Sequence, residues 1–91
     1  MVALVTDIKW KFSLAAARDR IACGPQYTLL TDKYHVTVYK SRDAKAYEIV
    51  IIEIRTGKRL YESRFDKFYQ PTIDAREARE QAILKLSRFS L

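Results

Sequence analysis

The side chains that could carry out chemistry in this sequence are few, and their spacing matches no catalytic arrangement. His35 is the single histidine among the 91 residues. A metal site with two histidines, or a relay that uses several, therefore cannot be assembled within one chain. Because His35 stands between Tyr34 and Val36 in an apolar stretch, we interpret it as a surface or cross-strand residue of a strand.

The single cysteine and the acidic residues do not strengthen the case for catalysis. Cys23 precedes Gly24-Pro25, a turn that would expose a thiol, but no general base stands nearby. Glu48, Glu53 and Glu62 lie in β-like segments without forming an evident pair, and no glycine-rich phosphate loop or paired-cysteine spacing occurs. The sequence therefore predicts a protein that is not an enzyme and uses neither metal nor cofactor, unless an oligomer joins His35 side chains or a cleft pairs His35 with Glu53.

Composition predicts one domain over residues 1–91, with enough apolar content (48%) for a modest core. The longest aliphatic run, residues 49–52, is too short to span a bilayer, and Asp7 and Lys9 interrupt any signal-like apolar segment. One cysteine excludes an internal disulfide and fits a reducing compartment, so we expect a cytoplasmic protein, or one inside a virion or host cell if it is viral. The net charge of +6 is spread along the chain, which permits nucleic acid, a membrane surface or an acidic protein as partner and requires none.

The N-terminal third supports two alternative structures. Alternation of apolar and polar residues over 8–14 predicts a short strand, followed by a helix over 14–22 that Ser13 caps and Gly24-Pro25 ends. A single helix over 7–22 is the alternative, because Trp10 and the apolar residues that follow it also fit one helical face.

The rest of the chain predicts a β-meander and a closing helix. Strands are expected over 27–31 and 34–40, and then over 46–55 and 58–65 around a Thr56-Gly57 turn. A helix follows Pro71, with Asp74 and Glu77 at capping-box spacing and an apolar stripe along one face. We therefore predict the α+β class: an antiparallel meander of about four strands, a short N-terminal strand and helix, and a C-terminal helix packed on one sheet face.

A two-residue turn at Thr56-Gly57 would fix which residues each sheet face carries. It pairs Ile52 with Tyr61 and Val50 with Ser63, so Val50, Ile52, Ile54, Tyr61 and Phe65 would pack against the helices together with Val36 and Val38. The opposite face would expose a mixed surface that we predict to bind another protein or a second copy of the chain, as in an adaptor, an inhibitor, an assembly subunit or another regulatory module. Its predicted residues are Tyr39, Ile49, Ile51, Leu60 and Glu62, beside His35, Thr37, Glu53 and Arg64.

Two other interpretations of the sheet surface remain open. An ordinary solvated face is as compatible with the pattern, and a one-residue bulge at the turn would exchange the two faces.

Basic side chains gather at the predicted ends of the sheet. The simplest explanation of this clustering is that turns are exposed to water and are therefore commonly charged. The alternative is a sequence-tolerant RNA- or DNA-binding protein whose cations follow the phosphate backbone, with Tyr47 or Tyr69 near enough to stack on bases. Its predicted residues are Lys40, Arg42, Lys45, Arg64 and Lys67 at one end, with Lys33, Arg55, Lys58 and Arg59 gathered at the other.

Overall fold

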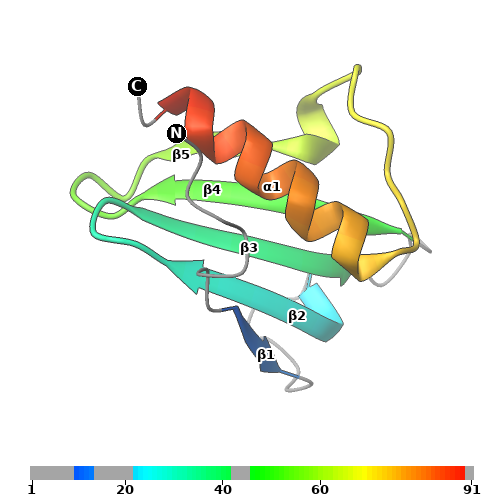
Figure 1. Ribbon diagram of the computed structural model, residues 1–91. Coiled ribbons are helices and arrows are strands. Elements are labelled where there is room, and N and C mark those ends of the chain that lie inside the picture. The colour runs from blue at the N-terminus through cyan, green and yellow to red at the C-terminus, as the bar shows by residue number, and fades with distance from the viewer. Residues whose placement is uncertain (1–9, 14–21, 42–45, 90–91) are drawn as a thin grey trace.

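The described part of the chain folds into an antiparallel sheet with an α-helix across it, which confirms the α+β class (Figure 1). The computed structural model describes residues 10–13, 22–41 and 46–89. The sheet has the order β1-β2-β3-β4-β5, so every strand pairs with its neighbour in sequence. The described elements are β1 (Lys11–Ser13), β2 (Ala22–Leu30), β3 (Tyr34–Ser41), β4 (Tyr47–Glu53), β5 (Arg59–Glu62), a 3-10 turn η2 (Ser63–Phe65) and α1 (Ala75–Phe89).

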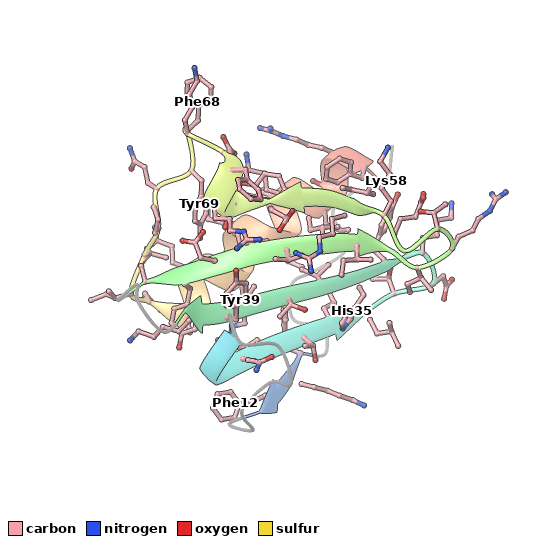
Figure 2. The ribbon with its side chains drawn as sticks, turned by 180° about the vertical axis from the view of Figure 1, so that it is seen from behind. Phe12, His35, Tyr39, Lys58, Phe68 and Tyr69 are labelled. Carbon is pink, nitrogen blue, oxygen red and sulfur yellow. The ribbon has the colours of Figure 1, made fainter. Side chains whose placement is uncertain are left out.

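The two sheet faces differ in what covers them. The helix α1 lies over β3 and β4 on one side, which we call the covered face. No described helix or strand lies over the opposite side, which we call the open face. Figure 2 looks onto the open face, with α1 behind the sheet. No helix in the described part of the chain combines the length and apolarity needed to cross a membrane.

The N-terminal third confirms the predicted short strand within residues 8–14 and contradicts the single-helix alternative. Residues 11–13 form strand β1, so a single helix over 7–22 is wrong for this stretch. Residues 14–21 of the predicted short helix lie outside the described residues, and Ala22 already belongs to β2. Gly24-Pro25 do not end a helix but lie within β2, where the pairing with β3 is irregular between Ala22 and Gln26. A proline has no N–H to donate, so an interruption of the ladder is where a strand tolerates it.

The hairpin between β4 and β5 turns over four residues, not the two predicted. The backbone N–H of Glu53 donates to the carbonyl of Lys58 at 2.8 Å, which leaves residues 54–57 as the loop. Gly57 adopts φ 71°, the left-handed conformation that favours glycine, and its N–H donates to the carbonyl of Glu53. Beyond the loop a bulge follows, so that Ile52 faces Arg59 while Ile51 faces Tyr61.

This register reverses the predicted orientation of β4. Ile49 and Ile51 are completely buried on the covered face, where they join Val36 and Val38, whose inward orientation is as predicted. Val50 and Ile52 point to the open face instead. The prediction failed because the four-residue turn and the bulge together shift the pairing by an odd number of residues, and side chains alternate with a period of two.

Two further residues expected in the core lie at the surface. Ile54 is in the turn and Phe65 is in η2, and their side chains are 46% and 72% exposed. The predicted last strand over 58–65 ends at Glu62, because residues 63–65 form the 3-10 turn. Tyr61 does pack against the core on the covered side, as predicted.

The helix α1 begins with a different cap from the predicted capping box. Asp74 Oδ1 accepts the N–H of Arg76 at 2.9 Å, as expected of a cap residue. The Glu77 carboxylate accepts a hydrogen bond from the Thr72 hydroxyl, and the same hydroxyl oxygen accepts the N–H of Asp74. The predicted apolar stripe is confirmed at its centre, since Ala78, Ala82 and Leu86 are buried against the sheet.

Candidate binding surfaces

Four of the five residues predicted to bind a protein partner are buried or pack against the core. Ile49 and Ile51 lie beneath α1, and Leu60 packs against the same core from β5. Tyr39 points to the open face, as predicted, but its side chain is only 5% exposed. Glu62 stays on the open face and is partly exposed. The predicted exposure is therefore wrong for Ile49 and Ile51, and Leu60 is partly buried.

A different set of side chains lines the open face. Cross-strand partners in an antiparallel sheet point to the same side, so the register places these residues directly. The centre of this surface, on β3 and β4, carries Val50 and Ile52 beside Thr37 and His35, and charged side chains stand at the β1 and β5 edges. One row consists of Leu30, His35, Ile52 and Arg59, and the next of Lys11, Thr28, Thr37, Val50 and Glu62. A further row on the same face, Gln26, Tyr39 and Glu48, contains two buried side chains, because Tyr39 is 5% and Glu48 9% exposed.

Glu62 neutralises part of the positive charge at the β5 edge of the open face. Glu62 Oε1 accepts a hydrogen bond from the Arg59 guanidinium at 2.8 Å and is 3.4 Å from that of Arg64. Such exposed pairs add little stability. They do reduce the attraction of this edge for a phosphate backbone.

His35 has apolar cross-strand neighbours on the open face. It pairs with Leu30 on one side and Ile52 on the other, which fits its interpretation as a cross-strand residue. Glu53 follows Ile52 and therefore points to the other side of the sheet, where its carboxylate accepts the hydroxyl hydrogen of Thr56 at 2.7 Å. The fold does not place His35 against Glu53.

The described members of the predicted nucleic-acid site share one end of the sheet. Lys40 lies one residue before the end of β3, with its ammonium 5.9 Å from the ring centre of Tyr47, and Arg64 and Lys67 follow β5 at the same end of the sheet (Figure 1). Arg42 and Lys45 lie outside the described residues. Of the two predicted stacking residues, Tyr47 is buried, with 6% of its side chain exposed. Tyr69 is partly exposed, and its hydroxyl donates to the carbonyl of Tyr47 at 3.1 Å.

Two exposed phenylalanines at this end were missed by the sequence analysis. We call residues 63–74, between β5 and α1, the aromatic loop. Phe65 and Phe68 are 72% and 81% exposed, and Figure 2 shows Phe68 pointing away from the sheet. The guanidinium of Arg64 lies 4.7 Å from the ring centre of Phe65, and the ammonium of Lys67 lies 5.3 Å from that of Phe68. The repeated order of cation then phenylalanine, at 64–65 and 67–68, was the available sequence signal.

Asp66 fixes the aromatic loop from its centre. One carboxylate oxygen accepts the N–H of Phe68 at 3.0 Å, and the other accepts the Tyr61 hydroxyl at 2.9 Å and is 3.6 Å from the Lys85 ammonium. The Phe68 N–H, the Tyr61 hydroxyl and Lys85 hold the pKa of Asp66 below its ordinary value. Burial, together with the Asp66 carboxylate, raises the pKa of the Tyr61 phenol.

The second half of the aromatic loop is attached to β4. The N–H of Tyr47 donates to the carbonyl of Thr72 at 2.9 Å, and the Tyr69 hydroxyl donates to the carbonyl of Tyr47. Burial, with the negative charges of Glu48 and Glu77, raises the pKa of Tyr69 to about 12. These contacts leave Phe68 projecting from a loop whose backbone is held on both sides.

A polar cleft of about 230 Å³ separates the aromatic loop from α1. It is smaller than the roughly 300–1,000 Å³ typical of small-molecule sites, and it has room for one planar ring. Phe68 and Lys85 stand in its wall together with two amide side chains. The complete lining is Phe68, Tyr69, Gln70, Thr72, Glu77, Gln81 and Lys85.

Comparison of this chain with protein-family models, with curated proteins and with solved structures finds no match.

Proposed function

We propose that this protein is a small non-enzymatic module that binds a partner protein through the open face of its sheet, as an adaptor, an inhibitor or an assembly subunit. The observation that carries the proposal is the aliphatic character of both faces of β4. The covered face accounts for Ile49 and Ile51, and no described element accounts for Val50 and Ile52. A strand with one solvated face ordinarily alternates apolar with polar residues, so apolar residues on both sides favour a second covering layer.

The chemistry of the open face specifies the kind of partner. Val50 and Ile52 lie at its centre beside Thr37 and His35, and Glu62 already neutralises part of the positive charge at the β5 edge. An interface with an apolar centre and a polar rim is typical of protein–protein contacts. We therefore expect a partner with a flat, apolar and weakly charged surface, in preference to a strongly acidic one.

Site-specific photo-crosslinking tests the proposal. A photoreactive phenylalanine analogue replaces Thr37 in the middle of the open face and, as a matched control, Leu84, which is 60% exposed on α1. We expect one discrete protein adduct from position 37 and none of the same mass from position 84. The adduct should disappear in a Val50→Gln, Ile52→Gln background that retains the wild-type circular dichroism spectrum.

The outcomes separate the possible occupants of the open face. An adduct of twice the chain mass identifies a second copy, which light scattering then confirms. Equal adducts from both positions, or an adduct indifferent to the glutamine substitutions, would refute docking through this face.

A further inference from the structure

The aromatic loop exposes apolar rings that the fold itself does not use. Phe65 and Phe68 lie within a segment otherwise tied to β4, β5 and α1, and yet their rings are 72% and 81% exposed. Because Asp66 and Tyr69 hold the backbone between and after them, a ligand meets rings that are already positioned. Such preorganisation lowers the entropic cost of binding.

Each exposed ring is accompanied by a cation. Arg64 stands 4.7 Å from the Phe65 ring centre, and Lys67 stands 5.3 Å from that of Phe68. An aromatic ring offers a stacking platform to any nucleobase, and an adjacent cation attracts the phosphate attached to that base. Arg64 also contacts Glu62 at 3.4 Å, whereas the Asp66 carboxylate between the two rings is engaged inward by the Tyr61 hydroxyl and Lys85.

The cleft beside Phe68 supplies groups that suit the edge of a base. Gln70 and Gln81 carry amides that can both donate and accept hydrogen bonds. The same lining contains the Glu77 carboxylate and Lys85, whose ammonium lies 3.6 Å from the Asp66 carboxylate. The cleft volume of about 230 Å³ suits one planar ring. Base faces are accessible in a single strand and are hidden by stacking in a duplex, so this arrangement favours unpaired nucleotides.

We propose that the aromatic loop and its cleft bind single-stranded nucleic acid, with bases stacked on Phe65 and Phe68 and phosphates near Arg64 and Lys67. The contacts lie at the opposite end of the sheet from the β4–β5 turn, where Lys58 stands in Figure 2. The proposal is independent of the protein-binding open face. The two surfaces can be tested separately.

Fluorescence anisotropy with labelled 12-nucleotide single strands of DNA and RNA, and with a matched duplex, tests this site. We expect wild-type protein to prefer either single strand over the duplex, with affinity that falls as salt rises. The Phe65→Ala, Phe68→Ala double variant should lose about tenfold or more in affinity, because alanine removes both stacking platforms. Lys67→Ala should weaken binding less and reduce the salt slope by about one.

Matched variants keep the test specific. Leu84→Ala removes an exposed apolar side chain elsewhere, and Lys58→Ala removes a cation at the opposite end of the sheet. The leucine variant should bind like wild type, and the Lys58 variant should lose only a small, salt-sensitive part of the affinity. The Val50→Gln, Ile52→Gln variant should also bind single strands normally, which distinguishes this site from the open face.

Three results would overturn the proposal. The first is the absence of single-strand binding at low salt. The second is full binding by the Phe65→Ala, Phe68→Ala variant. The third is that a labelled polyglutamate peptide binds and the oligonucleotides do not. This result would identify the aromatic loop as a docking site for acidic protein.

Discussion

Strand β4 presents aliphatic side chains to both faces of the sheet, and the two faces place them in different surroundings. Ile49 and Ile51 lie beneath α1 in the core and have no exposed surface. Val50 and Ile52 belong to the same strand and have similar side chains, but no described element covers them. The buried pair holds the fold together. Under the proposed function, the partly exposed pair binds the partner, so that stability and binding are divided between alternate residues of a single strand.

The largest expected effect is the difference in stability between substitutions at Ile51 and at Ile52. Ile51→Ala leaves a cavity in the centre of the core and should reduce the free energy of unfolding by about 2–5 kcal/mol. Ile52→Ala removes the same atoms from the open face and should cost about 1 kcal/mol or less. Urea denaturation of both variants measures the difference. Equal losses would contradict the assignment of the two faces.

Ser63 provides the next largest effect, because it connects η2 with the backbone and with a side chain of β4. Its hydroxyl oxygen accepts the N–H of Ile49 at 2.7 Å, and the hydroxyl donates to the Glu48 carboxylate at 2.7 Å. Ser63→Ala leaves both buried groups without this partner and should cost about 1–3 kcal/mol. The matched control is Ser87→Ala on the exposed side of α1, where calorimetry should show almost no change in melting temperature.

The sequence predicted the elements that depend on local periodicity, but it did not predict the orientation of β4. Alternation over 34–40 and the spacing of Ala78, Ala82 and Leu86 were sufficient to predict β3, α1 and their buried sides, because those patterns depend on local periodicity. The orientation of β4 depended on the turn. Since residues 49–52 are all apolar, their pattern could not reveal a register error.

The candidate sites were predictable to a smaller extent. His35 and Glu62 were placed correctly on the open face, and Arg64 and Lys67 at one end of the sheet. The exposure of Phe65 and Phe68 was missed, because extending the strand to residue 65 assigned Phe65 to the core. Only the 3-10 turn and the contacts of Asp66, which join residues distant in sequence, turn these rings outward.

A substitution of Tyr69 in the aromatic loop should reduce stability less than the substitutions in β4 and at Ser63. Tyr69→Phe removes the hydrogen bond to the Tyr47 carbonyl and should cost about 1 kcal/mol at neutral pH. The pKa of Tyr69 is raised from 10.0 to about 12, so its neutral form stabilises the fold below pH 10. That contribution is lost as pH rises from 10 toward 12. As pH rises from 10 toward 12, the melting temperature should fall less for the Tyr69→Phe variant than for wild type.

Asp66 is expected to have the smallest effect on the whole fold, because its contacts are confined to the aromatic loop and its nearest supports. Its pKa is lowered from 3.8 by the Phe68 N–H, the Tyr61 hydroxyl and Lys85, so its ionised form stabilises the folded state. That stabilisation is present above pH 3.8 and is lost as pH falls through the lower folded-state pKa. Asp66→Ala should lower the melting temperature at pH 7, and the difference from wild type should shrink in acid. An unchanged difference at pH 2.5 would argue against an ionised loop centre.

The most direct test of the central claim compares how fast single cysteines on alternate β4 positions react. In a Cys23→Ser background, Ile51→Cys and Ile52→Cys variants are treated with iodoacetamide under native conditions. The account predicts rapid modification of the Ile52→Cys variant and, for the Ile51→Cys variant, modification limited by unfolding. The reverse order of reaction rates would indicate the two-residue turn, with Ile49 and Ile51 at the surface. It would also remove the basis for docking on the open face.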